Sequence, residues 1–249
     1  MSIISDNKIS PNAITPLKNH LLLALPIVEY DRLFPFFELV KLELDDVIYE
    51  SGDKLLYVYF PVDAIISISY AMESGSSAEI SVVGNEGVIG VALFMGGEST
   101  ISRAVVKSAG YAYRIKGHYF MEEFNRHGNF LSLMLRYTQA LITQMSQTAV
   151  CNRYHTIEQQ LCRLLLLSLD RLPDNKIEMT QELIANMLGV RREGVTEAAG
   201  KLHKLGVINY HRGHIIVLDR EKLENLSCEC YCVVKKETDR LLPDVSIPN

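Results

Sequence analysis

The chain has 249 residues, of which 48% are hydrophobic and 22% charged, an ordinary globular composition with room for one large or two medium domains. Its formal net charge of −5 excludes a protein that coats nucleic acid through bulk positive charge, while a locally basic face stays compatible with specific binding. No stretch approaches the roughly 20 apolar residues of a membrane span, the N-terminus has no signal-peptide core, and five cysteines, an odd number, fit reduced thiols, so we expect a cytoplasmic protein.

Residues 1–127 are predicted to form one domain built mostly of β-strands. A polar leader reaches Thr15, Asn19 is suited to cap a short helix over His20 to Ala24, and a second short helix is expected over Asp31 to Phe37. Short β-rich runs then alternate with glycines, namely VKLELDDVIYE, LLYVYFPVDAIISISYAM, AEISVVG and RAVVKSAGYAYRI. Such strands, separated by turn residues, predict an antiparallel sandwich or roll.

Residues 128–155 are predicted to form a long dimerisation helix that ends in a hinge near Asn152 to His155. Apolar and small residues recur in alternating steps of four and three along it, at Leu131, Leu135, Thr138, Ile142, Met145 and Ala149. This spacing is that of a coiled-coil seam over about three heptads. Such a stripe packs more often on its own domain than on a second chain. The length of this one, and its position between two domains, favour a parallel dimer interface.

Residues 156–232 are predicted to form a winged helix-turn-helix domain. Thr156 is suited to cap a helix over Ile157 to Leu172 that stops at Pro173. Two more helical patterns then meet at Gly189, with the apolar spacing of helices packed across a tight turn, at Ile184, Leu188, Val190, Val195 and Ala198. The second of them, Arg191 to Leu205, would present its N-terminal side chains to the DNA major groove, and the run INYHRGHIIVLD predicts the two strands of a wing.

A short helix over Arg220 to Leu226 precedes three closely spaced cysteines, and residues 233–249 are interpreted as a tail. Cys228, Cys230 and Cys232 alternate, so in an extended segment their thiols would project to one side and could share a soft metal ion or be oxidised together. The spacing differs from the C-x-x-C of common zinc sites, and no fourth ligand is near in sequence. Ordinary reduced thiols are therefore favoured, with these three as weak metal candidates.

This order of a β-roll, a long helix and a winged helix-turn-helix resembles the Crp-Fnr family of bacterial transcription regulators. The resemblance covers Leu21 to Leu226 and is most specific in MTQELIANMLGVRREGVTEAAGKL and the wing, whereas YFPVDAIISISY and VVGNEGVIGVALF match more in rhythm than in chemistry. It implies an α+β fold with an N-terminal antiparallel, cyclic-nucleotide-binding-like β-roll as sensor. It also implies a homodimer on palindromic double-stranded DNA, with RNA polymerase as a further candidate partner.

The resemblance places Arg192 and Glu193 at the family's Arg-Glu position in the recognition helix, with Thr196 one turn later. An arginine can bond guanine O6 and N7 together, and a glutamate can accept from cytosine N4. Arg191, which we also assign to DNA binding, stands where a Ser or Thr cap would be better, and Glu197 stands where some members have a second base-reading arginine. The residues assigned to the DNA backbone are Thr180, Gln181, Lys201 and Arg212.

The signal is left open by the sequence. Members that bind cyclic AMP carry a Gly-Glu pair for the ribose and an Arg-Ser pair for the phosphate, but this chain has Gly90-Val91 and an arginine, Arg103, out of register. Cyclic AMP is therefore disfavoured, and Arg103 is a weak candidate for another anionic effector. An N-terminal iron-sulfur cluster is disfavoured because the first cysteine is Cys151, and no spacing selects a haem ligand among His118, His127 and His155.

The leading hypothesis is thus a DNA-binding transcription regulator. The alternative is a ligand- or redox-sensing module whose winged helix mediates protein contacts. An enzyme is disfavoured because no phosphate-binding glycine motif, Ser-His-Asp order or carboxylate pair is found in a supporting context. Cys151 and His155 lie four residues apart on a predicted helix, and we interpret them as packing residues rather than as a nucleophile and its base.

Overall fold

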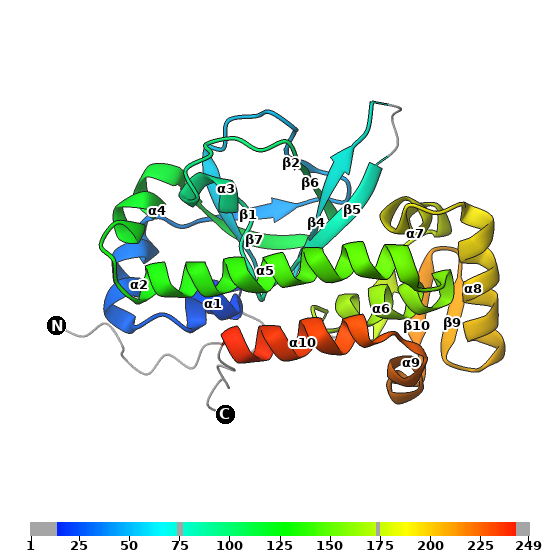
Figure 1. The fold of residues 1–249 in the computed structure, drawn as a ribbon. Helices are drawn as coiled ribbons and strands as arrows, with labels where there is room; N and C mark the ends of the chain where they lie inside the picture. Colours follow the sequence, from blue (N-terminus) through cyan, green and yellow to red (C-terminus); the bar gives the residue numbers. More distant parts are fainter. Residues whose placement is uncertain (1–13, 74–76, 173–174, 243–249) are drawn as a thin grey trace.

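The computed structural model describes residues 14–73, 77–172 and 175–242, so most of the predicted leader, Pro173 and residues 243–249 lie outside the described part. The helices are α1 (His20–Leu23), α2 (Ile27–Leu33), α3 (Val91–Phe94), α4 (Gly117–Phe124), α5 (Asn129–Tyr154), α6 (Ile157–Leu169), α7 (Gln181–Leu188), α8 (Arg192–Lys204), α9 (Arg220–Leu226) and α10 (Glu229–Leu241). The strands are β1 (Glu38–Leu42), β2 (Val47–Tyr49), β3 (Tyr57–Pro61), β4 (Ile65–Ala71), β5 (Ser77–Val83), β6 (Arg103–Ser108), β7 (Gly110–Lys116), β8 (Lys176–Glu178), β9 (Ile208–His211) and β10 (His214–Val217). The fold is α+β, as predicted (Figure 1).

The N-terminal domain is an antiparallel β-roll made of two sheets. Its strand orders are β1-β7-β3 and β2-β6-β4-β5, and every pairing within them is antiparallel. Alternate residues of the strands point inward and form one core, which includes the fully buried Val58, Phe60, Ile66, Val106 and Ile115. The predicted roll is confirmed.

The short N-terminal helices are fastened to this roll by Asn19. Its side-chain oxygen accepts from the backbone N–H groups of Leu21 and Leu22, as predicted for a helix cap, while its amide donates to the carbonyls of Pro61 and Gly87 at 2.9 Å each. The second helix starts earlier than predicted, at Ile27, and continues into a 3₁₀ turn, Phe34–Phe36.

Helix α5 runs the length of the molecule, from the β-roll to the C-terminal domain (Figure 1). The residues predicted to form its dimer seam divide into two groups. Thr138 is buried and its hydroxyl donates to the Met134 carbonyl, and Met145 packs against the core of the roll. Leu135, Ile142 and Ala149 are exposed, and Leu131 is half-buried. The outward face of α5 is therefore a narrower apolar stripe than the predicted seam.

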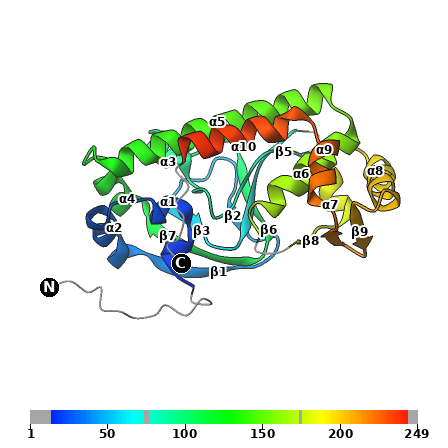
Figure 2. The ribbon, with the colours of Figure 1, turned by 90° about the horizontal axis from the view of Figure 1, so that it is seen from below.

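Helix α10 corrects two expectations about the C-terminal part of the chain. The cysteines do not lie in an extended segment, and the chain beyond residue 232 is helical as far as Leu241. Both views show α10 alongside α5, and Gln139 of α5 donates a hydrogen bond to Glu237 of α10 (Figures 1 and 2). Tyr231, Val234 and Leu241 recur at helical spacing and are buried. Charged residues between them hid this apolar stripe in the sequence.

The two domains share an interface. The leucine-rich helix α6 belongs to a core that also includes Ile65 and Val82 of the β-roll. The buried guanidinium of Arg171, which follows α6, donates to the Glu86 carboxylate at 2.8 Å and to the Val82 carbonyl of the roll at 3.3 Å. Within the described ranges, no helix is both long enough and apolar enough to span a bilayer.

Candidate functional site

Helices α7 and α8 form the predicted helix-turn-helix. Gly189 ends α7 with φ +65°, and the N–H groups of Gly189 and Val190 donate to the carbonyls of Asn186 and Ala185, which is a Schellman motif. Of the apolar residues that predicted the motif, four are buried: Ile184, Leu188, Val195 and Ala198. Val190 is half-buried. The second helix begins at Arg192 and ends at Lys204, within one residue of the prediction.

The N-terminal end of α8 presents the predicted base-reading residues to solvent. Arg191, Arg192, Glu193 and Thr196 are all exposed. Arg191 is the N-cap residue, and its side chain makes no capping hydrogen bond to any described residue, which agrees with its interpretation as a poor cap. The Thr196 hydroxyl donates to Gln181 Oε1 at 2.7 Å, so the two helices are joined beside this exposed end.

The wing lies next to the start of α7. Strands β9 and β10 are joined by a tight turn at Arg212 and Gly213, whose φ angles of +47° and +86° are typical of a type I′ hairpin. The Met179 N–H donates to the Gly213 carbonyl at 2.8 Å, which brings Arg212 close to Thr180, the N-cap of α7. A third strand, β8, pairs with β10 and was missed because its pattern covers only Lys176–Glu178.

Lys201 is a predicted contact whose charge is already held in ion pairs. Its ammonium lies 3.2 Å from Glu197 and 3.7 Å from Glu158 of α6. Ion pairs between exposed side chains stabilise a protein little, so they compete only weakly with a phosphate. The contact of Lys201 with the DNA backbone therefore stays a prediction. Lys204 and Gly200 lie on the outer side of α8, away from the buried Val195 and Leu202.

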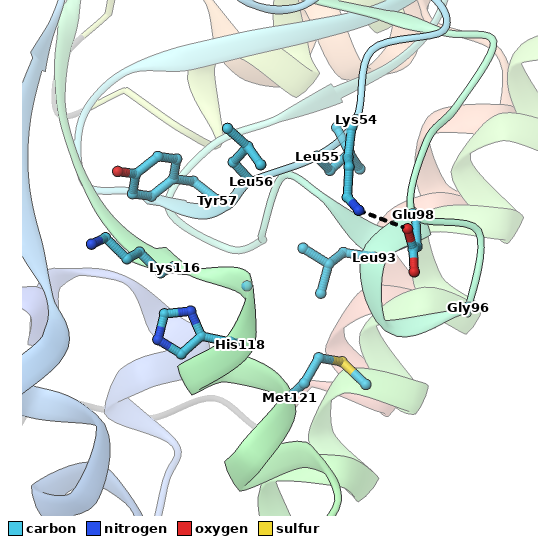
Figure 3. Close-up of a pocket in the computed structure, with 11 residues that line it drawn as sticks. Lys54, Leu55, Leu56, Tyr57, Leu93, Gly96, Glu98, Lys116, His118 and Met121 are labelled. Atoms are coloured by element: carbon cyan, nitrogen blue, oxygen red, sulfur yellow. Dashed lines mark ion pairs between the residues drawn. The ribbon is translucent and has the colours of Figure 1, made fainter.

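The β-roll carries an open cleft of about 630 Å³ beside α3 and the start of α4. Figure 3 shows Lys54 paired with Glu98 on one side, Lys116 and His118 on the other, and Leu93 between them. The Lys54 and Glu98 charges are 3.1 Å apart. Of the three histidines considered as haem ligands, His118 lines this cleft, His127 is exposed after α4, and His155 lies at the end of α5, so the fold does not bring them together.

The roll differs from cyclic-AMP-binding members at the two positions that the resemblance relates to the nucleotide. Val91, at the start of α3, offers no carboxylate to a ribose hydroxyl. Arg103 is partly exposed and donates from Nε to Glu50 at 2.9 Å, so its guanidinium is held in a surface ion pair. Between the sheets, Val58, Phe60 and Ile89 are at most 1% exposed and fill the interior of the roll.

The structure regroups the cysteines. Cys232 is exposed, whereas Cys228 and Cys230 are buried against Cys151. The Cys151 and Cys228 sulfurs are 3.5 Å apart, and Cys230 Sγ lies 3.6 Å from His155 Nδ1. Hydrogen bonding to Cys151 lowers the pKa of the Cys228 thiol, and burial raises that of Cys230.

Sequence reasoning missed this grouping because it joins residues 77 positions apart. The one local signal was the spacing of Cys151 and His155, since residues four apart lie on the same face of a helix. The interpretation of this pair as packing residues does not account for their contacts with Cys228 and Cys230. Cys162 is buried separately, in the core of the C-terminal domain.

Comparisons with known proteins match both domains. Residues 159–226 match the Crp-like helix-turn-helix domain, and residues 39–127 match the cyclic nucleotide-binding domain. The chain is similar to the solved structure of FixK2 from Bradyrhizobium japonicum, with TM-score 0.67 and 18% identity over 77% of this chain and 98% of that one. For CLP, a c-di-GMP-responsive global regulator from Xanthomonas campestris, the TM-score is 0.63 and the identity 12%, over 77% and 99% of the two chains. For a CRP-family transcriptional regulator from Thermus thermophilus the TM-score is 0.62 and the identity 16%, over 76% and 96%. At these identities the likeness is one of fold, and no curated protein sequence matches the chain.

Proposed function

Because this chain belongs to the Crp-Fnr family of transcription regulators, carrying its two domain types in order, we propose that it binds double-stranded DNA sequence-specifically as a homodimer. The observation that carries the proposal is the exposed N-terminal end of α8, with Arg192 and Glu193 side by side and unburied. The prediction that the chain is not an enzyme is confirmed by this family, whose members are regulators. A regulator of this kind acts on the chromosome, so we expect it in the cytoplasm.

In the proposed complex, α8 enters the major groove and its first turn reads base edges. Arg192 bonds a guanine, while Glu193 accepts from a cytosine on a neighbouring pair. The residues assigned to the DNA backbone contact phosphates, which position the domain without reading sequence. Thr180 and Gln181 supply them from the start of α7, where backbone N–H groups favour anions, and Arg212 supplies one from the wing.

The proposed dimer forms along α5. Leu135 and Ile142 are 53% and 54% exposed, and with Ala149 they are spaced by heptads on one face. Pairing these stripes in parallel would set two copies of α8 on half-sites about one helical turn, roughly 34 Å, apart, and so favour a palindromic site. Contact with RNA polymerase is a further expectation for an activator of this class.

The cleft beside α3 is the best candidate for the effector site. Its walls combine apolar side chains, such as Leu93 and Met121, with Lys116 and His118 on the rim. This lining suits a small ligand that has an apolar body and an anionic group. Arg103, considered earlier for an anion, lies outside it and is paired with Glu50.

The test of this function is the base preference of Arg192→Ala. We expect the wild-type chain to select a palindromic sequence, and the variant to lose about 1–3 kcal/mol of discrimination at one position of each half-site. Binding-site selection followed by fluorescence anisotropy at fixed salt measures this. Arg240→Ala is the matched control, because Arg240 lies on α10 and pairs with Glu237.

The variant Arg212→Ala distinguishes contacts that position the protein on the DNA backbone from contacts that read the base sequence. Loss of one phosphate contact in each subunit of the proposed dimer should weaken binding to all sequences alike and reduce the slope of log affinity against log salt by about 2. Unchanged base preference in Arg192→Ala would overturn the assignment of α8 as reader. A wild-type chain that shows no sequence-specific shift at all would favour a wing that contacts protein instead.

A further inference from the structure

Four side chains from two distant parts of the chain meet where α5 ends. Cys151 and His155 come from the last turn and C-cap of α5, and Cys228 and Cys230 from the start of α10. One ligand atom of each lies within 4.8 Å of all the others, and the three thiols are buried. We propose that these residues form a mononuclear Zn²⁺ site, which the family resemblance does not assign.

Two of the six ligand-atom distances match those of a tetrahedral ion, and the other four are within 4.8 Å. With Zn–S bonds of about 2.3 Å and a Zn–N bond of about 2.0–2.1 Å, the ligand atoms of a tetrahedral site are separated by roughly 3.5–3.8 Å. The Cys151–Cys228 sulfurs are 3.5 Å apart and Cys230 Sγ lies 3.6 Å from His155 Nδ1. Three cysteines and one histidine are also a standard ligand set of structural zinc sites.

The surroundings of His155 orient it as a ligand. Its Nδ1 faces the sulfurs, and its Nε2 lies 3.3 Å from the Glu229 carboxylate. A carboxylate that accepts from the outer ring nitrogen fixes the tautomer and leaves the inner nitrogen free to bind metal. The Gln160 side-chain amide donates to the His155 carbonyl at 2.9 Å and to that of Cys151 at 3.4 Å, which holds the end of α5 in place.

A buried cation partly offsets the charge of the loaded site. Three thiolates around Zn²⁺ carry a net charge of −1, which is costly to bury without a cation nearby. The buried Arg163 of α6 supplies one, and its charge acts on Cys230. Arg163 donates to Thr148 Oγ1 at 2.7 Å, and its Nε has no hydrogen-bond partner among the described residues. Cys228 is also the N-cap of α10, where a helix favours thiolate.

The ion would join α5, which packs on the β-roll, to α10, which follows the winged helix-turn-helix. It would tie the end of α5 to the start of α10 across 77 residues, at the hinge from which α6 leads into the helix-turn-helix. Binding free energy at such a site is also folding free energy, because the site does not exist in the unfolded chain. Zinc would therefore hold α10 against α5.

Metal content of the full-length chain is the first test. The protein, purified without a metal-affinity tag, should contain one Zn²⁺ per chain by inductively coupled plasma mass spectrometry. Cys228→Ser and Cys230→Ser should each lose most of it. Cys232→Ser is the matched control, since Cys232 lies on the same helix but is exposed, and it should retain the full content.

Cobalt substitution tests the ligand set and does not depend on how stable a variant is. Metal-free wild-type chain titrated with Co²⁺ should show sulfur-to-cobalt charge-transfer absorption and the ligand-field bands of a tetrahedral complex. His155→Cys should retain the ion with an altered spectrum, whereas His155→Ala should bind it at least tenfold more weakly. Circular dichroism checks that each variant is folded.

Three results would overturn the site. The first is a folded wild-type chain that takes up neither Zn²⁺ nor Co²⁺. The second is equal metal content in Cys228→Ser, Cys230→Ser and Cys232→Ser. The third is a different chemistry at the same residues, either iron with acid-labile sulfide or a disulfide between Cys151 and Cys228 in protein purified anaerobically.

Discussion

Helix α8 carries two glycines whose surroundings differ sharply. A Cβ at Gly194 would lie 2.6 Å from Ile157 Cδ1, whereas no described atom lies within 4 Å of one at Gly200. The first glycine therefore lets α8 approach α6 closely. The second costs helix stability with no packing in return, and it lies on the face that we propose to enter the major groove.

Gly200→Ala should raise the free energy of unfolding by about 1 kcal/mol, because alanine favours the helix and meets no neighbour. Gly194→Ala should gain less or lose stability, because the Ile157 side chain must move. Urea denaturation of the two variants measures the difference. If Gly200→Ala also weakens DNA binding, the bare backbone at this position is a contact surface; equal stability changes in both variants would contradict this account.

At the residue scale, local chemistry was predictable and long-range grouping was not. Arg192, Glu193 and the glycine turn follow from patterns within one short stretch, which the structure places on α8 and at the end of α7. Cys151 and His155 could not be connected to Cys228 from sequence, because nothing local brings together residues that are separated by a whole domain.

Among the elements, α5 has two faces with different surroundings. Its inner face is anchored to the roll by Tyr137, whose hydroxyl donates to the Val88 carbonyl, and by Gln144, whose amide donates to Val82. Its outer face carries Leu135 and Ile142. A heptad count alone cannot separate these faces, and for this reason the buried Thr138 was counted in the seam.

Ile142→Glu should convert the dimer to a monomer. In a parallel pair, the two substituted side chains would face each other and place like charges in an apolar seam. Size-exclusion chromatography with light scattering measures the mass. Met72→Glu, which alters another exposed apolar residue, on the β-roll, should leave the mass unchanged. A dimer that persists in Ile142→Glu would place the subunit contact elsewhere.

For the whole molecule, the sequence predicted the order of the parts but not how they meet. The β-roll, long helix and winged domain appear in the predicted order. Their interface is formed by residues such as Arg171 and Glu86, which are a partly buried ion pair in space but ordinary helix-end and turn residues in sequence. No periodicity marks such a pair.

Glu79 lies at this same junction. With Leu183 and Met187 of α7 it lines a hollow between the sheet and the helix-turn-helix. The residue as a whole is only partly buried, but its carboxylate is enclosed, and Oε2 has no hydrogen-bond partner in the described part of the chain. Burial raises the pKa of Glu79 to about 7, against the opposing effects of Ser67, Arg163, Lys107 and Arg171.

Because this pKa is higher in the folded than in the unfolded chain, the folded state binds more protons, and stability falls as pH rises towards about 7. Glu79→Gln should remove that dependence and stabilise the protein at about pH 8 by up to about 3 kcal/mol, at about 1.4 kcal/mol per pKa unit. Urea denaturation at about pH 5 and pH 8 measures both. The exposed Glu73→Gln is the control, and equal pH dependence in wild type and Glu79→Gln would refute the assignment.

The return of α10 to α5 also sets an order of assembly. Gln139 meets Glu237 across 98 positions and Cys151 meets Cys228 across 77, with the winged domain closed into the loop between them. Contacts of such sequence separation form late, because the intervening chain must first become compact. During synthesis the flank of α5 that α10 covers therefore stays bare until the winged domain has left the ribosome, and the long helix gains its full support only once the last helix of the described chain has been made.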